Sequence, residues 1–325
     1  MERRDFLKTA AVGAAVAATG RAAAFSMADE STAKIALVKT QDRARGISAA
    51  LDLIQTASPK GKKTLIKPNF NTADPTPGST HPDTLRQLVK EMQARGAASV
   101  TIGESCGPGD TKAVMDRLGI PALAKELGID VINFEELPEN GWKQFNTPGN
   151  HWKNGFRVAA PVLDTEYLLW TCCLKTHGFG GIHSMSLKLA VGVIHKNVRM
   201  SEMHASANIR RMIAEINQTF TPQLIVMDGI DIFVDGGPMT GKLVNAGVIV
   251  AGTDRIAIDA VGLAVLKNHG SNDAIMSRKI FEQEQLARAA ELGLGVKSPS
   301  GIDIVTGDAE SAAYAGKLRE ILDKG

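Results

Sequence analysis

Cysteine is scarce in this sequence, which excludes one kind of redox protein. Only three cysteines occur in 325 residues, and no two of them form a C-x-x-C pair. Three thiolates cannot complete a four-cysteine cluster, so we expect no iron–sulfur cluster. Cys172 and Cys173 are adjacent, and adjacent side chains of a strand point to opposite faces, so a disulfide between them would be strained. We expect both to be buried as small apolar side chains.

An excess of one charge and long apolar runs are missing as well. The 37 Lys and Arg side chains nearly balance 35 Asp and Glu, and the net charge of +2 arises in the first 28 residues. Without a basic field we expect neither nucleic acid nor an anionic membrane as a partner, so any anion must bind locally. No run after the N-terminal segment approaches about 20 apolar residues, so we expect no membrane span in the mature protein.

The N-terminus resembles a twin-arginine export signal. It reads "MERRDFLKTAAVGAAVAATGRAAAFS", with paired arginines, an Ala-rich segment and small residues suited to cleavage after Ala24 or Ala28. An exposed amphipathic helix is the alternative. We expect residues 1–28 to be the signal, and residues 29–325 to reach the periplasm through the twin-arginine export machinery. This route transports folded proteins, which often carry a cofactor.

The remaining sequence alternates short apolar strands with amphipathic helices, a pattern typical of an α/β protein. We expect a mostly parallel sheet with helices on both faces, in a single compact domain at 29–325. Residues 137–163 break the rhythm with Gly and Pro and predict a small inserted flap subdomain. The expected strands are 34–40, 63–70, 99–105, 130–136, 167–177, 223–233, 246–252 and 301–307; the main expected helices are 47–57, 82–95, 205–220 and 254–268.

Polar side chains follow several of these strands, where ligands of parallel sheets bind. Each could be only a cap or turn residue, but together they predict one rim. They are Asn69 and Asn71, then Glu104, Ser105 and Cys106, then Lys175 and His177, then Asp228, Asp231 and Asp235.

The segment "HGFGG" after Lys175 predicts a strand-to-helix turn whose glycines leave backbone N–H groups open to an anion. Packing alone is the alternative, and no G-x-x-x-x-G-K-[ST] indicates a nucleotide triphosphate site. A helix from about Ser184 would place Ser184, Lys188 and His195 on one face. Lys188 among apolar neighbours would have a lowered pKa and a more nucleophilic amine, unless it extends to solvent. The expected ligand-binding residues are Lys67, Asn69, Lys175, Gly180, Gly181 and Ser184, with balancing charge from Lys67, Lys175 and Lys188.

Four histidines fall within 28 residues, and imidazole binds zinc, nickel, copper and iron. His183 and His195 at opposite ends of a helix would lie roughly 18 Å apart, so only a subset can share one ion. Structural or substrate-binding histidines are the alternative. We expect a divalent metal such as nickel, zinc or iron to be held by His177, His204 and Asp228, with Asp235 as a further acidic ligand to consider.

Several motifs resemble the domain-of-unknown-function 362 family. They are "LKTHGFGGIHSMSLKLAVGVI", "MDGIDIFVDGGPMTG" and "VIVAGTDRIAIDAVG", the last with a G-T-D-x-x-A-x-D helix entry. Many members carry an added ferredoxin-type cluster, which this chain lacks. "GGIHSMSLK" and "HASANIRRMIAEI" are also similar to lactate racemase-like enzymes. That similarity implies Lys188 as the anchor of a nickel-pincer nucleotide, His204 as a metal ligand, and His177 or His183 as the acid–base group.

We therefore expect a periplasmic enzyme that binds an anionic small molecule together with a metal or metal-containing cofactor. The expected catalytic residues are His177, Lys188 and His183. A non-catalytic metal or cofactor carrier is one alternative, and a racemase or epimerase acting next to a carboxylate is the other.

Overall fold

A computed structural model of the protein describes residues 32–325. The expected signal peptide at 1–28 lies outside the described residues. Ser31–Gly325 forms one compact unit. The strands are β1 (Ala33–Lys39), β2 (Lys63–Lys67), β3 (Ser99–Glu104), β4 (Asp130–Asn133), β5 (Trp142–Phe145), β6 (Phe156–Ala159), β7 (Tyr167–His177), β8 (Ile182–Ser184), β9 (Leu224–Gly236), β10 (Gly241–Gly252) and β11 (Ile302–Val305).

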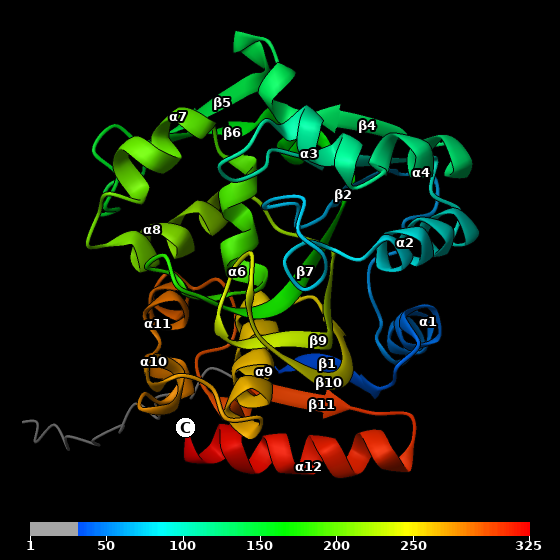
Figure 1. The fold of residues 1–325 in the computed structure, drawn as a ribbon, viewed down its shortest axis with the longest axis vertical. Coiled ribbons are helices and arrows are strands. Elements are labelled where there is room, and N and C mark those ends of the chain that lie inside the picture. The colour runs from blue at the N-terminus through cyan, green and yellow to red at the C-terminus, as the bar shows by residue number, and fades with distance from the viewer. Residues whose placement is uncertain (1–31) are drawn as a thin grey trace, which may run out of the picture. The chain divides into compact units, whose positions relative to one another are not determined.

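Helices join these strands over most of the described chain (Figure 1). They are α1 (Arg43–Leu53), α2 (Pro82–Ala94), α3 (Thr111–Arg117), α4 (Ile120–Leu127), α5 (Ala160–Asp164), α6 (Ser186–Leu189), α7 (Lys196–Val198), α8 (Ile209–Ile216), α9 (Arg255–Asn268), α10 (Asp273–Met276), α11 (Glu284–Glu291) and α12 (Ala309–Lys324).

The central sheet has the strand order β11-β1-β10-β9-β7-β2-β3-β4, and β8 pairs with β7. The pairs β4–β3, β3–β2, β2–β7, β7–β9 and β1–β11 are parallel. The long β9–β10 hairpin makes its own pair and the β10–β1 pair antiparallel. The expected α/β class with a mostly parallel sheet is therefore confirmed.

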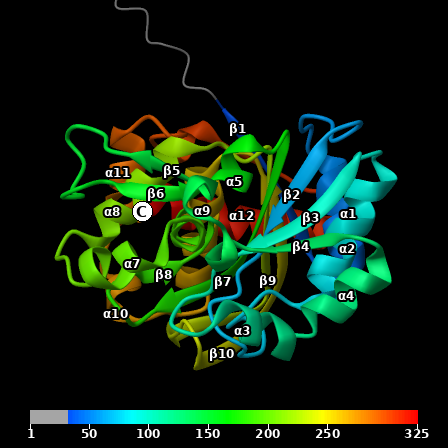
Figure 2. The ribbon, with the colours of Figure 1, turned by 90° about the horizontal axis from the view of Figure 1, so that it is seen from above.

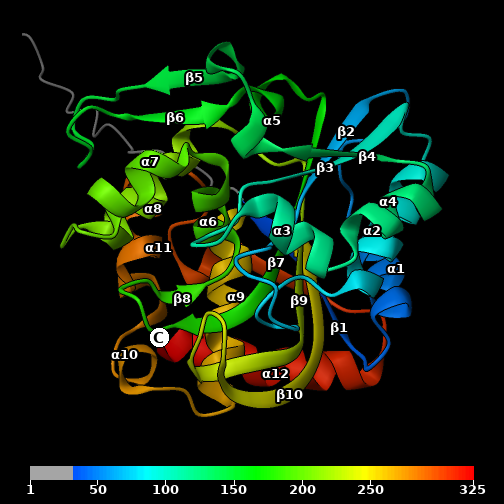
Figure 3. The same cartoon turned by 45° about the horizontal axis from the view of Figure 1, so that its top comes forward.

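Two apolar cores cover the two faces of this sheet. One face packs against α1 to α4, through residues such as Ile47, Leu85 and Leu123. The other face packs against α6, α8, α9, α11 and α12. Figures 2 and 3 show the two groups of helices on opposite sides of the central strands. Burial on both faces explains why the central strands have continuous apolar sequences.

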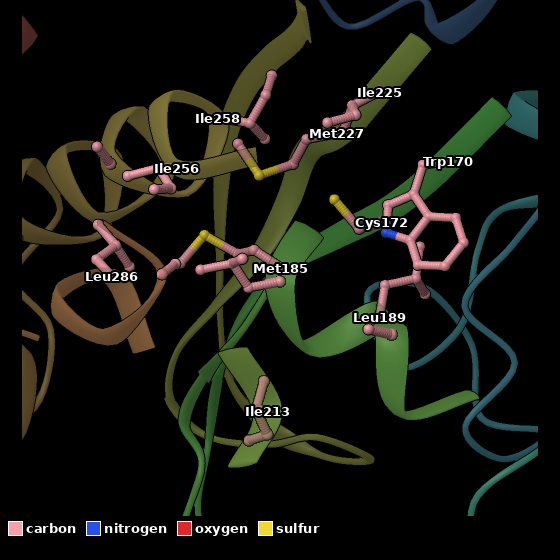
Figure 4. Close-up of a cluster of buried hydrophobic side chains, with 14 of the residues drawn as sticks. Trp170, Cys172, Met185, Leu189, Ile213, Ile225, Met227, Ile256, Ile258 and Leu286 are labelled. Carbon is pink, nitrogen blue, oxygen red and sulfur yellow. The ribbon is translucent and has the colours of Figure 1, made fainter. Parts of the chain in front are cut away.

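Strand β7 lies at the centre, and all eleven of its residues are buried. Its alternating side chains enter both cores: Trp170 and Cys172 contribute to one, and Leu169 to the other. Figure 4 shows Trp170 and Cys172 among methionine and isoleucine side chains of the larger core. All three cysteines are free and buried, and burial raises the pKa of the Cys173 thiol to about 11. The expectation for Cys172 and Cys173 is confirmed.

The structure corrects the expected helix that was to begin near Ser184. Ser184 ends strand β8, α6 covers only Ser186–Leu189, and a 3-10 turn follows at Ala190–Val193. Ile194 is extended, so the chain leaves the helical path before His195. A continuous face carrying Ser184, Lys188 and His195 therefore does not form.

Residues 137–163 contain a separate two-stranded antiparallel sheet, β5–β6. It lies between β4 and β7 in the chain and does not pair with the central sheet. Its role as a flap stays a prediction. Within the described part of the chain, no helix has the length and apolar character needed to cross a membrane.

Candidate functional site

A cavity of about 820 Å³ opens beside the carboxyl end of β7. Its walls come from the turn after β7, from α6 to α8, and from the turn between β9 and β10. The lining residues include four cationic side chains, Lys188, Lys196, Arg199 and Arg210, and two histidines, His177 and His204. No Asp or Glu is among the residues that line it in the described structure. Lys196 and Arg210 are ion-paired with Glu135 and Glu284, so the uncompensated positive charge of the lining comes from Lys188 and Arg199.

A smaller cavity of about 50 Å³ adjoins the first and shares His177, Lys188 and Arg199 with it. It extends toward the ends of β2 and β3. Its other polar lining residues are Lys67, Asn69, Asn71, Glu104, Ser105 and Ser184. The ends of three parallel strands thus meet at one place, as expected for ligand sites of parallel sheets.

Lys188 lies on α6 between the two cavities, with 9% of its surface exposed. Among the described residues its ammonium has no hydrogen-bond or ion-pair partner. Burial, reinforced by the charges of Lys175 and Arg199, lowers the pKa of Lys188 to about 7. Near neutral pH this amine therefore exists in both protonation states.

The position of α6 depends on Asp259 of the neighbouring helix α9. The Asp259 carboxylate accepts hydrogen bonds from the backbone N–H groups of Ser186 at 2.7 Å and Leu187 at 3.0 Å. Met185 and Leu189 flank this turn and enter the larger core, which is shown in Figure 4. Burial raises the pKa of Asp259 to about 7. The last Asp of the G-T-D-x-x-A-x-D motif thus caps the helix that carries Lys188.

His177 ends β7 and is 6% exposed. Its Nδ1 accepts the backbone N–H of Phe179 at 3.2 Å, which leaves Nε2 as the protonated nitrogen of the neutral ring. Burial and the nearby charge of Lys188 hold the pKa of His177 far below its usual value. His177 therefore faces a ligand as a neutral N–H donor.

Gly181 allows His177 and Lys188 to approach each other. A Cβ at Gly181 would lie 2.8 Å from Lys188 Cε and 3.1 Å from His177 Nδ1. Since contacts below 3.0 Å require a neighbour to move, any larger residue would displace the lysine. Gly180 lines the large cavity, and its carbonyl accepts Arg210.

Lys67 and Glu104 form a buried ion pair at 2.5 Å in the smaller cavity. The Glu104 carboxylate also accepts the backbone N–H groups of Phe70 and Ser105, both at 2.8 Å. Burial lowers the pKa of Lys67, and the charge of Glu104 opposes this shift. Glu104 neutralises Lys67, and Arg199 donates to backbone carbonyls. Lys188 is therefore the lining cation that has neither an ion pair nor a hydrogen bond among the described residues.

Other predicted site residues lie outside both cavities. The Lys175 ammonium donates to the carbonyls of Pro77 and Gly78, at 2.8 and 2.5 Å. His183 is buried with neither ring nitrogen hydrogen-bonded within the described residues, and burial lowers its pKa to about 3. His195 contacts the ring of Trp142.

The expected metal set of His177, His204 and Asp228 is not assembled. Asp228 is fully buried and accepts Arg43 Nε at 2.9 Å and Thr84 Oγ1 at 2.7 Å. His177 and His204 line the large cavity without it. No group of three or more His, Cys, Asp or Glu residues between 32 and 325 is arranged to hold a metal ion.

The expected strand-to-helix anion turn is also corrected. "GFGG" connects the antiparallel strands β7 and β8, with Lys175 opposite Ser184 and His177 opposite Ile182. The helix that follows has its first N–H groups occupied by Asp259. The first N–H groups of this helix are therefore not open to an anion.

Sequence reasoning missed Arg199 and the apolar rim of the cavity. Arg199 is buried and donates to the carbonyls of Ser105, Cys106 and Ile194, so it connects the segment after α7 to the end of β3. Phe179 and Met200 line the large cavity and are exposed. Neither role has a local sequence signal, because both depend on segments far apart in the chain.

Comparisons with known proteins found a signal sequence, a relative and a structural likeness. Residues 1–20 match the twin-arginine translocation pathway signal sequence, which indicates export by that pathway. "Thylakoid-associated protein sll1697" of Synechocystis sp. is 24% identical over 214 residues, which cover 64% of this chain and 64% of that protein's length. The lactate racemase apoprotein from Thermoanaerobacterium thermosaccharolyticum is 12% identical in structural comparison, with a TM-score of 0.45 over 89% of this chain and 86% of that one.

The family expectation is tested by the match over the central part of the chain. Residues 64–264 match the family described as Domain of unknown function (DUF362). This range contains Lys67, Glu104, His177, Lys188 and Asp259, and it covers more than half of the chain. The chain therefore belongs to the DUF362 family.

Proposed function

We propose that this protein is an exported enzyme that binds an anionic small molecule between Lys188 and His177. The observation that carries the proposal is the cavity lining, which has four cationic side chains, no acidic one, and one ammonium without a partner among the described residues. Concave sites with a few convergent polar groups and perturbed pKa values are typical of ligand and active sites.

In this arrangement the protonated Lys188 binds the anionic group, and His177 Nε2–H donates a second hydrogen bond. Lys188 is also the best acid–base group of the site, because its pKa of about 7 allows it to gain or lose a proton near neutral pH. An anion bound to the ammonium would raise that pKa and favour the charged form.

A non-catalytic metal carrier is less well supported. A carrier would surround its ion with protein ligands, whereas the large cavity is open and the described residues contain no group of three or more ligands suited to a metal. His177 and His204 could supply two imidazoles to nickel, zinc or iron, with the ligand completing the coordination. Metal binding stays a prediction, which metal analysis of the natively exported protein would test.

A racemase or epimerase acting next to a carboxylate is a second candidate reaction. Lys188, His177 and His204 line one cavity, and the sequence resemblance assigns to them the roles of cofactor anchor, acid–base group and metal ligand. A nickel-pincer nucleotide would supply a hydride acceptor there. His183, the other acid–base candidate, is not among the cavity-lining residues.

Thermal-shift measurements with acetate, lactate and inorganic phosphate test the anion site. Binding to the native state raises stability by about 2.7 kcal/mol at a hundredfold excess over Kd. We expect at least one anion to raise Tm, and we expect Lys188→Met to abolish the shift. Lys112→Met is the control, because Lys112 is a surface lysine with 68% of its side chain exposed. No stabilising anion, or equal shifts in Lys188→Met and the native protein, would refute the proposal.

A further inference from the structure

The large cavity has an apolar side that a small anion would leave unused. Eight of its lining residues are apolar: Phe179, Val191, Met200, Ile209, Met239, Pro108, Ala207 and Pro238. At about 820 Å³ it has room for on the order of 25 waters. An anion of two or three carbon atoms would leave most of this space to water.

Two buried polar side chains and two exposed apolar ones line the same cavity. Lys188 and His177 are 9% and 6% exposed, whereas Phe179 and Met200 are 59% and 62% exposed. These two are among only four large hydrophobic side chains exposed between residues 32 and 325. Exposed apolar side chains gathered at a cavity mark a binding surface, because a ligand that covers them removes apolar area from water.

The two ends of the cavity are in direct contact. The Phe179 ring packs edge-on against the His177 ring, with centroids 6.0 Å apart, and the Phe179 backbone N–H donates to His177 Nδ1. A ligand bound at His177 would therefore lie beside the Phe179 side chain.

We propose that the ligand is an amphipathic anion, with its charged group at Lys188 and His177 and an aliphatic or aromatic body against Phe179 and Met200. This inference rests on the proposed anion site and specifies the class of its ligand. A carboxylate and a phosphate monoester share the required chemistry. The apolar body then supplies affinity, and the charge fixes its orientation.

The test is a calorimetric titration of the exported protein with acetate, butanoate, hexanoate and octanoate, and with octyl phosphate as a second headgroup. Burial of one methylene tightens binding roughly fourfold, so affinity should increase at least fiftyfold from acetate to octanoate. Octylamine, with the same chain and the opposite charge, should not bind. Octanol should bind far more weakly than octanoate.

Three variants, two tests and one control, locate the apolar contact. Met200→Ser and Phe179→Ser should flatten the dependence of affinity on chain length, and Met200→Ser should leave acetate binding within about twofold. Met276→Ser is the matched control, because Met276 is also an exposed methionine and is not among the cavity-lining residues. It should keep the full dependence.

The possible failures separate the two proposals. If acetate binds and longer chains bind no more tightly, the amphipathic ligand is refuted and the anion site stands. If no anion binds, the proposed function itself fails. If octylamine binds as well as octanoate, or if Met276→Ser weakens binding as much as Met200→Ser, the chains adsorb to general apolar surface, which also refutes the inference.

Discussion

Burial of Lys188 lowers the stability of the folded protein, and its position in the cavity explains why the residue is there. A buried ammonium without a partner disfavours the folded state, and functional sites commonly retain such groups. Its pKa is lowered from 10.5 in an ordinary lysine to about 7, first by burial and then by Lys175 and Arg199. Between these two values the unfolded chain holds a proton that the folded protein has released. The contribution of Lys188 to the free energy of unfolding should therefore rise as the pH rises from 7 to 10.5.

Lys188→Met should stabilise the empty protein. The gain should be on the order of 3 kcal/mol below pH 7, where the native lysine is charged, and should shrink as pH rises toward 10. Chemical denaturation of both proteins at pH 6, 7, 8 and 9 measures the difference. A variant less stable than the native protein at pH 6 would show that Lys188 has a stabilising partner in solution.

At the scale of elements, α9 controls the position of α6. Asp259 accepts two backbone N–H groups at the start of α6, so the carboxylate of one helix caps another. A one-turn helix has little stability of its own, and its orientation depends on such tertiary contacts. The motif residue Asp259 thus holds the helix that carries Lys188, without lining either cavity.

Asp259→Asn should weaken anion binding because the amide offers a single acceptor oxygen for two N–H groups. We expect a loss of about 1–2 kcal/mol of stability and a several-fold weaker anion affinity. The pH at which half of the anion-induced Tm shift is lost should also change, since the surroundings of Lys188 change.

The matched control for this variant is Asp254→Asn. Asp254 caps α9 itself through the N–H groups of Ile256 and Ala257 and also accepts Val296 N–H. Its loss should destabilise the protein by a similar amount and leave anion affinity unchanged. If both variants weakened anion affinity equally, Asp259 would have only a structural role and would not specifically position Lys188.

At the scale of the whole molecule, the export signal and the domain have separate tasks. The match to the twin-arginine signal spans residues 1–20, and Ser31–Gly325 is a compact unit of its own. We expect replacement of Arg3 and Arg4 by lysine to retain the protein in the cytoplasm, with the anion-induced Tm shift unchanged. Cell fractionation followed by thermal shift measures both. Undiminished periplasmic protein in the double variant would contradict a twin-arginine route.

The sequence by itself determined eight of the nine strands of the central sheet, the class of fold, the family and the signal. Strand β7 was predicted with its observed bounds, because a mostly apolar run between polar segments is a local pattern. The helix α2 was predicted to within one residue, because Pro82 and Gly96 mark its ends; Gly96 has a φ of +82°, which favours glycine. Lys188, His177, Gly180 and Ser184 were also predicted as site residues, and each of them lines a cavity.

Only the tertiary structure decided which polar groups remain open to a ligand. Lys175 and Lys188 are both lysines beside the same turn, yet one binds two carbonyls from a loop about a hundred residues away and the other has no partner among the described residues. Asp228 was expected at the metal and is held by Arg43 instead. The helix expected from Ser184 is cut short by the β7–β8 pairing before it and the turn at Ile194 after it. Partners so distant in sequence leave no local pattern, because burial and pairing are properties of the packed chain.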